Sequence, residues 1–141
     1  MSVPAPDDAG QQGPRPRSRA AAVPWGAFVL DVLLVVLFAL IGRLSHAEGL
    51  TFGGLVTTAS PFLAGTVGAW AVLATRGRPR PAGVAAGVLV WASTLVVGML
   101  LRAITGQGVA LSFILVAGTV TALFLIGWRA LGAWLVRRTA R

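Results

Sequence analysis

Four long apolar runs, separated by short polar segments, dominate the sequence. They cover about residues 23–42, 55–75, 82–101 and 109–128. Each has close to the ~20 predominantly apolar residues that an α-helix needs to cross the hydrocarbon core of a bilayer. None alternates as a barrel strand does, and a helix satisfies its backbone hydrogen bonds internally, as lipid requires. The pattern predicts an all-α integral membrane protein, a bundle of four transmembrane helices.

The flanking segments have a different composition. Residues 1–22 are rich in Pro, Gly, Gln and Asp and have no apolar period, which is typical of a disordered tail. We therefore expect a cytoplasmic tail at 1–22, a transmembrane domain at 23–136 and a basic cytoplasmic C-terminus at 137–141. The first apolar run is longer than the core of a signal peptide and carries Asp31, so we interpret it as a membrane anchor.

Composition and charge support a membrane protein and predict its orientation. Only 11% of residues are charged, against roughly a quarter in soluble domains. All positive charges are arginines, and with the N-terminus inside, only Arg43 and Arg102 face outward. The others then face the cytoplasm: Arg15, Arg17, Arg19, Arg76, Arg78, Arg80, Arg129, Arg137, Arg138 and Arg141. By the positive-inside rule, this bias predicts a multi-pass protein of the inner (plasma) membrane with both termini in the cytoplasm.

Small residues recur at helical spacing within the runs. Gly83 and Gly87 form a GxxxG pattern, which lets two helix backbones approach closely. Pro61 removes a backbone donor, so we expect a kink or a break in the second helix there, either purely structural or a hinge. We predict a helix-packing seam made of these small residues and the proline: Gly42, Pro61, Gly65, Gly68, Gly83, Gly87 and Gly98.

Asp31 is the one charge inside the first apolar run. A carboxylate near the bilayer centre costs about 2.5–3.5 kcal/mol, so it should face protein or water and be paired or protonated. Arg129, at the end of the fourth run, is the natural partner. Three interpretations stay open at this point: a structural ion pair, a protonatable site coupled to transport, and simple proximity to the membrane interface.

A second group of polar residues lies at the other ends of the helices. Arg43, His46 and Glu48 follow the first run, and Arg102 ends the third. Two converging arginines could hold a carboxylate or phosphate. Alternatively, Arg43 pairs with Glu48 while Arg102 reaches toward lipid headgroups.

The chain lacks the residue combinations that catalysis, metal binding and nucleic-acid binding need. It has no cysteine and a single histidine, so we expect no metal site. No phosphate loop, nucleophile elbow or zinc-protease pattern occurs, so we expect neither a catalytic residue nor a cofactor. The arginines form short clusters without a nucleic-acid-binding motif, and we expect no nucleic-acid partner.

Several positions match the pattern of a known family. The segment from Phe38 through Gly42 and Arg43 to His46 resembles the F-x-x-x-G-R-x-S-H signature of the family catalogued as domain of unknown function 3054. Further positions resemble that pattern too: Asp31, Pro61, Phe62, Trp91, Gly98, Leu101, Arg102, Gly106, Ser112, Phe113, Gly127, Trp128 and Arg129. The resemblance covers about residues 27–130. It implies a small four-helix integral membrane protein of a kind common in actinobacteria, and it implies no activity.

Two functional hypotheses follow from the sequence. The first is a compact, non-enzymatic bundle in the inner membrane, in contact with lipids and acting as a homo-oligomer or as a subunit of a membrane complex. The alternative is a small proton-coupled transporter or channel, with Asp31 as the protonatable group and Arg43 and Arg102 as an anion-attracting pair at the outer side.

Overall fold

The computed structural model describes residues 25–45, 49–76 and 82–139. These residues form α1 (Trp25–Ser45), α2 (Phe52–Arg76), α3 (Val84–Ile104), α4 (Leu111–Leu125) and α5 (Gly127–Thr139). Each of α1, α2 and α3 is long and apolar enough to cross a membrane, and α4 and α5 together make a fourth such span. The prediction of an all-α bundle of four membrane-spanning helices is confirmed. The expected tail at 1–22 lies outside the described residues.

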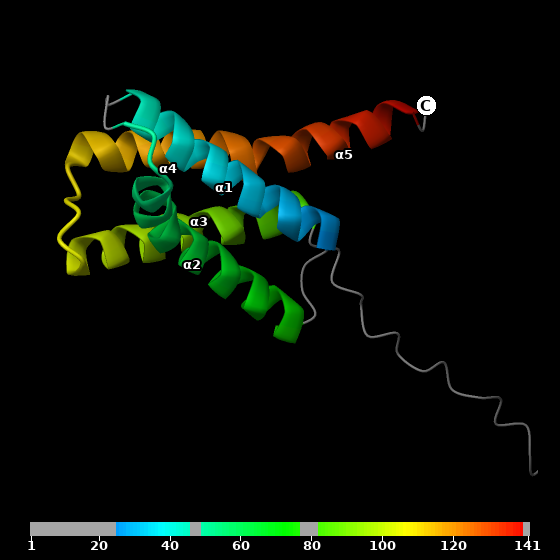
Figure 1. Ribbon diagram of the computed structural model, residues 1–141. Helices are drawn as coiled ribbons and strands as arrows, with labels where there is room; N and C mark the ends of the chain where they lie inside the picture. The colour runs from blue at the N-terminus through cyan, green and yellow to red at the C-terminus, as the bar shows by residue number, and fades with distance from the viewer. Residues whose placement is uncertain (1–24, 46–48, 77–81, 140–141) are drawn as a thin grey trace, which may run out of the picture.

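The four spans form a ring in which α1 packs on α2 and α4, and α3 packs on α2 and α4. Short connections make successive helices antiparallel (Figure 1). We call the end at which α1 begins and α2 ends the proximal end, and the other the distal end. The helix formed by α4 and α5 starts at the distal end, and α5 runs outward past its neighbours at the proximal end (Figure 1).

The fourth span differs most from the sequence prediction. We expected it at 109–128, but the helix continues to Thr139 and takes in part of the expected basic C-terminus. The apolar run ends where arginines begin, yet arginine is a good helix former, so charge ends the run without ending the helix. Ile126 is the single non-helical residue between α4 and α5. Its N–H still donates to the Ala122 carbonyl, and its own carbonyl accepts from Ala130 N–H, so the helical path is maintained.

Aromatic side chains fill the centre of the bundle. Phe62 of α2 is fully buried and packs edge-on against Phe38 of α1, with 5.2 Å between ring centroids. Its other neighbours include Phe113 of α4, whose ring centroid lies 6.3 Å away. The outer surface is covered with exposed Leu, Val and Ile side chains, as expected of helices that face lipid.

Glycine brings helices together at two of the predicted seam positions on α2 and α3. A Cβ on Gly65 would lie 2.5 Å from the Ser93 carbonyl oxygen of α3, so this glycine allows two backbones to approach. A Cβ on Gly98 would lie 2.5 Å from Cδ1 of Phe62, so this glycine makes room for a ring. The close contact between α2 and α3 therefore depends on one glycine from each helix, Gly65 of α2 and Gly98 of α3.

Three other predicted seam positions are not at contacts between helices inside the bundle. A Cβ on Gly42 or Gly68 would meet open space, and Gly68 is exposed, so neither is at a close helix contact. Gly83 is the N-cap of α3 and not an interior seam residue. The buried side of α2 includes the predicted Pro61 and Gly65, but in the second half of the helix it follows the large side chains and leaves Gly68 outside. The other buried residues of α2 are Ala59, Phe62, Thr66, Ala69, Trp70 and Leu73.

Pro61 is buried within α2, which is continuous through it, so there is a helix and not a break at this position. In Figure 1, α2 bends in its first half. Proline provides no N–H for the Thr57 carbonyl, and the Ser60 hydroxyl lies 3.5 Å from that oxygen as a donor. A neighbouring hydroxyl in this way partly replaces the missing backbone bond.

Candidate functional site: a buried carboxylate held by four donors

Asp31 of α1 and Arg129 of α5 meet inside the bundle, toward its proximal end. Arg129 Nη1 donates to Oδ1 of Asp31 at 2.8 Å, and Nη2 donates to Oδ2 at 2.7 Å. Both residues are fully buried. The geometry is the two-pronged arrangement in which the planar guanidinium matches a carboxylate, the strongest form of such a contact. The sequence prediction of Asp31 and Arg129 as partners is therefore consistent with the structure.

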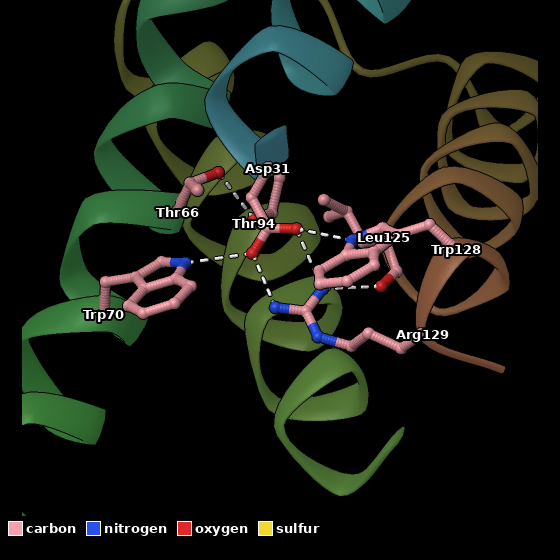
Figure 2. A network of polar contacts seen from close by, with 7 residues as sticks. All are labelled: Asp31, Thr66, Trp70, Thr94, Leu125, Trp128 and Arg129. Carbon is pink, nitrogen blue, oxygen red and sulfur yellow. Dashed lines mark hydrogen bonds and ion pairs between the residues drawn. The ribbon is translucent and has the colours of Figure 1, made fainter. Parts of the chain in front are cut away.

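Two tryptophans complete the shell around the carboxylate (Figure 2). Trp70 of α2 donates its indole N–H to Oδ2 at 2.9 Å, and Trp128 of α5 donates to Oδ1 at 3.0 Å. An ionised carboxylate has about four acceptor sites, and four donors from α2 and α5 are present here. Asp31 therefore joins three spans at one point, and its oxygens are closed off from water.

The Arg129 side chain has its own supports. Nη1 also donates to the carbonyl of Leu125, the last residue of α4, at 2.7 Å. The guanidinium carbon lies 4.5 Å from the centre of the Trp128 ring, a cation–π distance. Buried ion pairs offset the cost of desolvation only when such additional contacts satisfy the remaining donors.

Gly87 explains why the arginine fits. A Cβ at this position would lie 2.7 Å from Cδ of Arg129 and 3.1 Å from the Leu125 carbonyl oxygen. The second glycine of the GxxxG pattern therefore makes room for a buried arginine side chain, in addition to bringing helices together. The sequence pattern identified the right residue, but the structure gives it a different neighbour.

A pair of hydroxyls lies beside this site. The Oγ1 atoms of Thr66 in α2 and Thr94 in α3 are 2.8 Å apart, and both residues are fully buried (Figure 2). Thr66 also donates to the Phe62 carbonyl at 3.0 Å. This bond joins α2 and α3, the two helices that approach closely at Gly65, so polar and steric contacts reinforce one another at the same level of the bundle.

Sequence reasoning missed Trp70, Thr66 and the role of Trp128. Trp128 was noted only as a position that resembles the family pattern. A usable signal was nevertheless present: an intramembrane carboxylate needs N–H donors, and tryptophan is the one apolar residue type here that brings a side-chain N–H. Trp128 is adjacent to Arg129, and a search for donors around Asp31 would have considered it.

The distal polar residues form a separate site. Arg43 of α1 and Arg102 of α3 both line a cavity of about 160 Å³, together with Phe38, Thr58 and Phe113. Arg43 Nη1 donates to Thr58 Oγ1 at 3.3 Å. His46 and Glu48, expected beside it, lie outside the described residues.

The distal arginines are each held in place. Arg43 Nη2 donates to the Gly49 carbonyl at 2.8 Å. Arg102 donates to the side-chain and backbone oxygens of Gln107, both at 3.0 Å, and its guanidinium carbon lies 4.3 Å from the centre of the Phe113 ring. The predicted proximity of Arg43 and Arg102 is thus present as two cavity-lining side chains. In the described part of the chain, no group of three or more His, Cys, Asp or Glu side chains could hold a metal ion.

Comparison with known proteins gives a family. The model of the family described as "Protein of unknown function (DUF3054)" matches residues 28–132, which include Asp31, Arg129 and both distal arginines. No curated protein and no solved structure matches the chain.

Proposed function

The chain belongs to the DUF3054 family of proteins of unknown function, and from the closed ion pair we propose that it is a non-enzymatic membrane bundle. In this proposal it acts through its surfaces, as a homo-oligomer or as a subunit of a membrane complex. It is a multi-pass membrane protein. The proposed location is the inner membrane, with both termini in the cytoplasm, because nine of the eleven arginines other than buried Arg129 then lie on the cytoplasmic side.

The observation that carries the proposal is the environment of Asp31. A carboxylate that couples proton movement to transport must exchange its proton with water or with a relay group. Asp31 is 0% exposed and accepts from Trp70, Trp128 and both terminal nitrogens of Arg129. Such an environment favours a rigid joint between helices over a proton-binding site.

Cross-linking in native membranes tests the proposed association. A photoreactive residue at an exposed position such as Leu33, Val96 or Leu123 is expected to give a discrete adduct, either with a second copy or with a partner. The matched control carries the same residue at buried Val90, where no intermolecular adduct should form. Monomers without any adduct from every outward position would contradict the proposal.

Cysteine labelling tests the orientation. The chain has no cysteine, so a single introduced thiol reports unambiguously. Thr105 follows α3 at the distal end, and Thr139 ends α5 at the proximal end. In spheroplasts, a membrane-impermeant maleimide should label Thr105→Cys and leave Thr139→Cys unlabelled until the membrane is broken. The reverse pattern would invert the proposed topology.

A second candidate function is small-anion transport, because Arg43 and Arg102 line one distal cavity. If Asp31 were its protonatable group, both Asp31→Asn and the paired variant Asp31→Asn/Arg129→Met should abolish proton-coupled flux in proteoliposomes. If the ion pair is structural, the paired variant should fold and keep any flux that the parent shows. Loss of flux in a folded paired variant would favour the transporter over the bundle.

A further inference from the structure

An open groove lies between α3 and α4 on the outside of the bundle. It has a volume of about 490 Å³, within the range of ligand-binding clefts. Trp91 of α3 forms one side, and Gly118, Thr119, Ala122, Leu123 and Ile126 form the other. Trp91 donates its indole N–H to the Gly118 carbonyl at 2.9 Å, which fixes the wall of the groove. The lining is almost entirely apolar, so its natural contents are hydrocarbon.

The groove leads toward the exposed end of α5. Because the helical path continues through Ile126, Ala133 and Arg137 follow Ala122 by 11 and 15 residues. These steps are close to three and four full turns, so the two residues lie within about 60° of Ala122 around the axis. Ala133 is small and Arg137 is exposed. A hydrocarbon chain that lies in the groove and continues along this side of α5 therefore leads to the positive charge of Arg137.

Helix length places that cation at headgroup depth. The span Leu111–Thr139 has 29 residues, whereas α1 and α3 have 21 each. At 1.5 Å per residue, an upright helix from Leu111 leaves a hydrocarbon core about 30 Å thick near residue 131. Trp134 is 46% exposed, as expected for an interfacial indole, and the Arg138 guanidinium carbon lies 3.9 Å from its ring centre.

We propose that this surface binds one anionic phospholipid, with an acyl chain in the α3/α4 groove and its phosphate at Arg137. Arg138 lies about 160° from Ala122 around the axis, and it adds positive charge at the same headgroup depth. The distance fits: an acyl chain that enters the hydrocarbon near residue 131 and extends about 15 Å reaches ten residues back along the helix, to the part of the groove lined by Ala122, Leu123, Ile126 and Gly127. That length is comparable with half the hydrocarbon thickness, which one acyl chain spans.

Charge favours a lipid over a second copy of this chain as the occupant. The whole sequence contains four acidic residues against twelve arginines, and Asp31, one of the four, is fully buried. A second copy therefore offers little negative charge to Arg137 and Arg138. An anionic headgroup supplies a phosphate that an arginine can hold through charge-assisted hydrogen bonds.

Native mass spectrometry of the full-length protein in detergent tests the proposal. The probes are dioleoyl phosphatidylglycerol, dioleoyl phosphatidylcholine and soluble glycerophosphoglycerol, the headgroup without chains. We expect tight binding of phosphatidylglycerol alone. Basic residues at a membrane surface contribute about a fivefold gain in affinity each, so Arg137→Gln/Arg138→Gln should lose about 30-fold. The corresponding double lysine variant should retain most of the affinity.

Groove variants distinguish a seated lipid from a headgroup held at the surface. Thr119 is exposed and lines the groove, so Thr119→Leu should fill it without disturbing the fold and weaken phosphatidylglycerol binding. Val116, also exposed but outside the groove, provides the matched control Val116→Leu. Equal binding of the two phospholipids, unchanged binding in the double glutamine variant, or equal effects of the two leucine variants would each overturn the proposal.

Discussion

The Asp31–Arg129 pair gives the sharpest test of how this bundle is held together. Replacing Asp31 with asparagine keeps the shape of the side chain and removes its charge. The fully buried Arg129 guanidinium is then left without its counter-charge. Breaking a buried pair from one side costs about 3–5 kcal/mol. We expect Asp31→Asn to lower the free energy of unfolding by that amount.

Removing both charges should recover most of this loss. Methionine at position 129 occupies much of the space of the arginine stem beside Gly87 and needs no partner. Replacing a buried pair with apolar or neutral groups is often neutral or stabilising by about 1–4 kcal/mol. The double variant Asp31→Asn/Arg129→Met should therefore be more stable than Asp31→Asn. The stability lost in Asp31→Asn and the stability lost in Arg129→Met, added together, should exceed the loss in the double variant by at least about 2 kcal/mol.

Unfolding in mixed micelles with increasing sodium dodecyl sulfate, followed by circular dichroism, measures these differences. Tryptophan fluorescence adds a local signal, because Trp70 and Trp128 donate to Asp31. Arg138→Met, at an exposed arginine of the same helix, is the matched control and should change stability little. The reasoning would be refuted if each single variant lost less than about 1 kcal/mol of unfolding free energy and the double variant lost the sum of the two, since independent sites are additive.

Three further substitutions follow from the packing and are measured by the same unfolding titration. Gly65→Ala should destabilise by about 1–3 kcal/mol, because its Cβ would lie 2.8 Å from the Thr94 Cα; Gly68→Ala, where the space is open, should not. Gly87→Ala should cost a similar amount and shift the tryptophan fluorescence, as it displaces the pinned arginine; an unchanged spectrum and stability would contradict this. Thr66→Val should cost about 0.6–1.7 kcal/mol, and no further loss should occur when Thr94 is already valine.

The number of spans and the pairing of Asp31 with Arg129 could be predicted because both follow from a strong constraint. A run of about 20 apolar residues has few stable alternatives to a membrane-crossing helix. Likewise, an intramembrane carboxylate needs a donor, and the sequence offers few cations near the right depth. These inferences depend on depth along the membrane axis, which sequence position gives directly.

The side of each helix that faces the core was harder to predict. In α2, Gly68 was expected in the seam, yet it is exposed while Phe62, Thr66 and Trp70 face inward. A small residue permits close approach but does not cause it, since the same residue can also face lipid, as Gly68 does. Which glycine is used depends on the large side chain opposite, such as Phe62 against Gly98. That partner belongs to another helix, so a single run does not contain the information.

The positions of the two polar sites indicate different roles for the two ends of the bundle: the proximal end holds the helices together, and the distal end presents a cavity. At the proximal site the charged groups bind each other. Four donors surround one carboxylate, and three spans meet there without exposed polar atoms on Asp31 or Arg129. The distal arginines instead line a cavity. A bundle fixed at one end and hollowed at the other can change its distal surface without losing its fold. Substitutions at Arg43 and Arg102 should therefore affect association or ligand contact more than stability, the opposite of the expectation for Asp31.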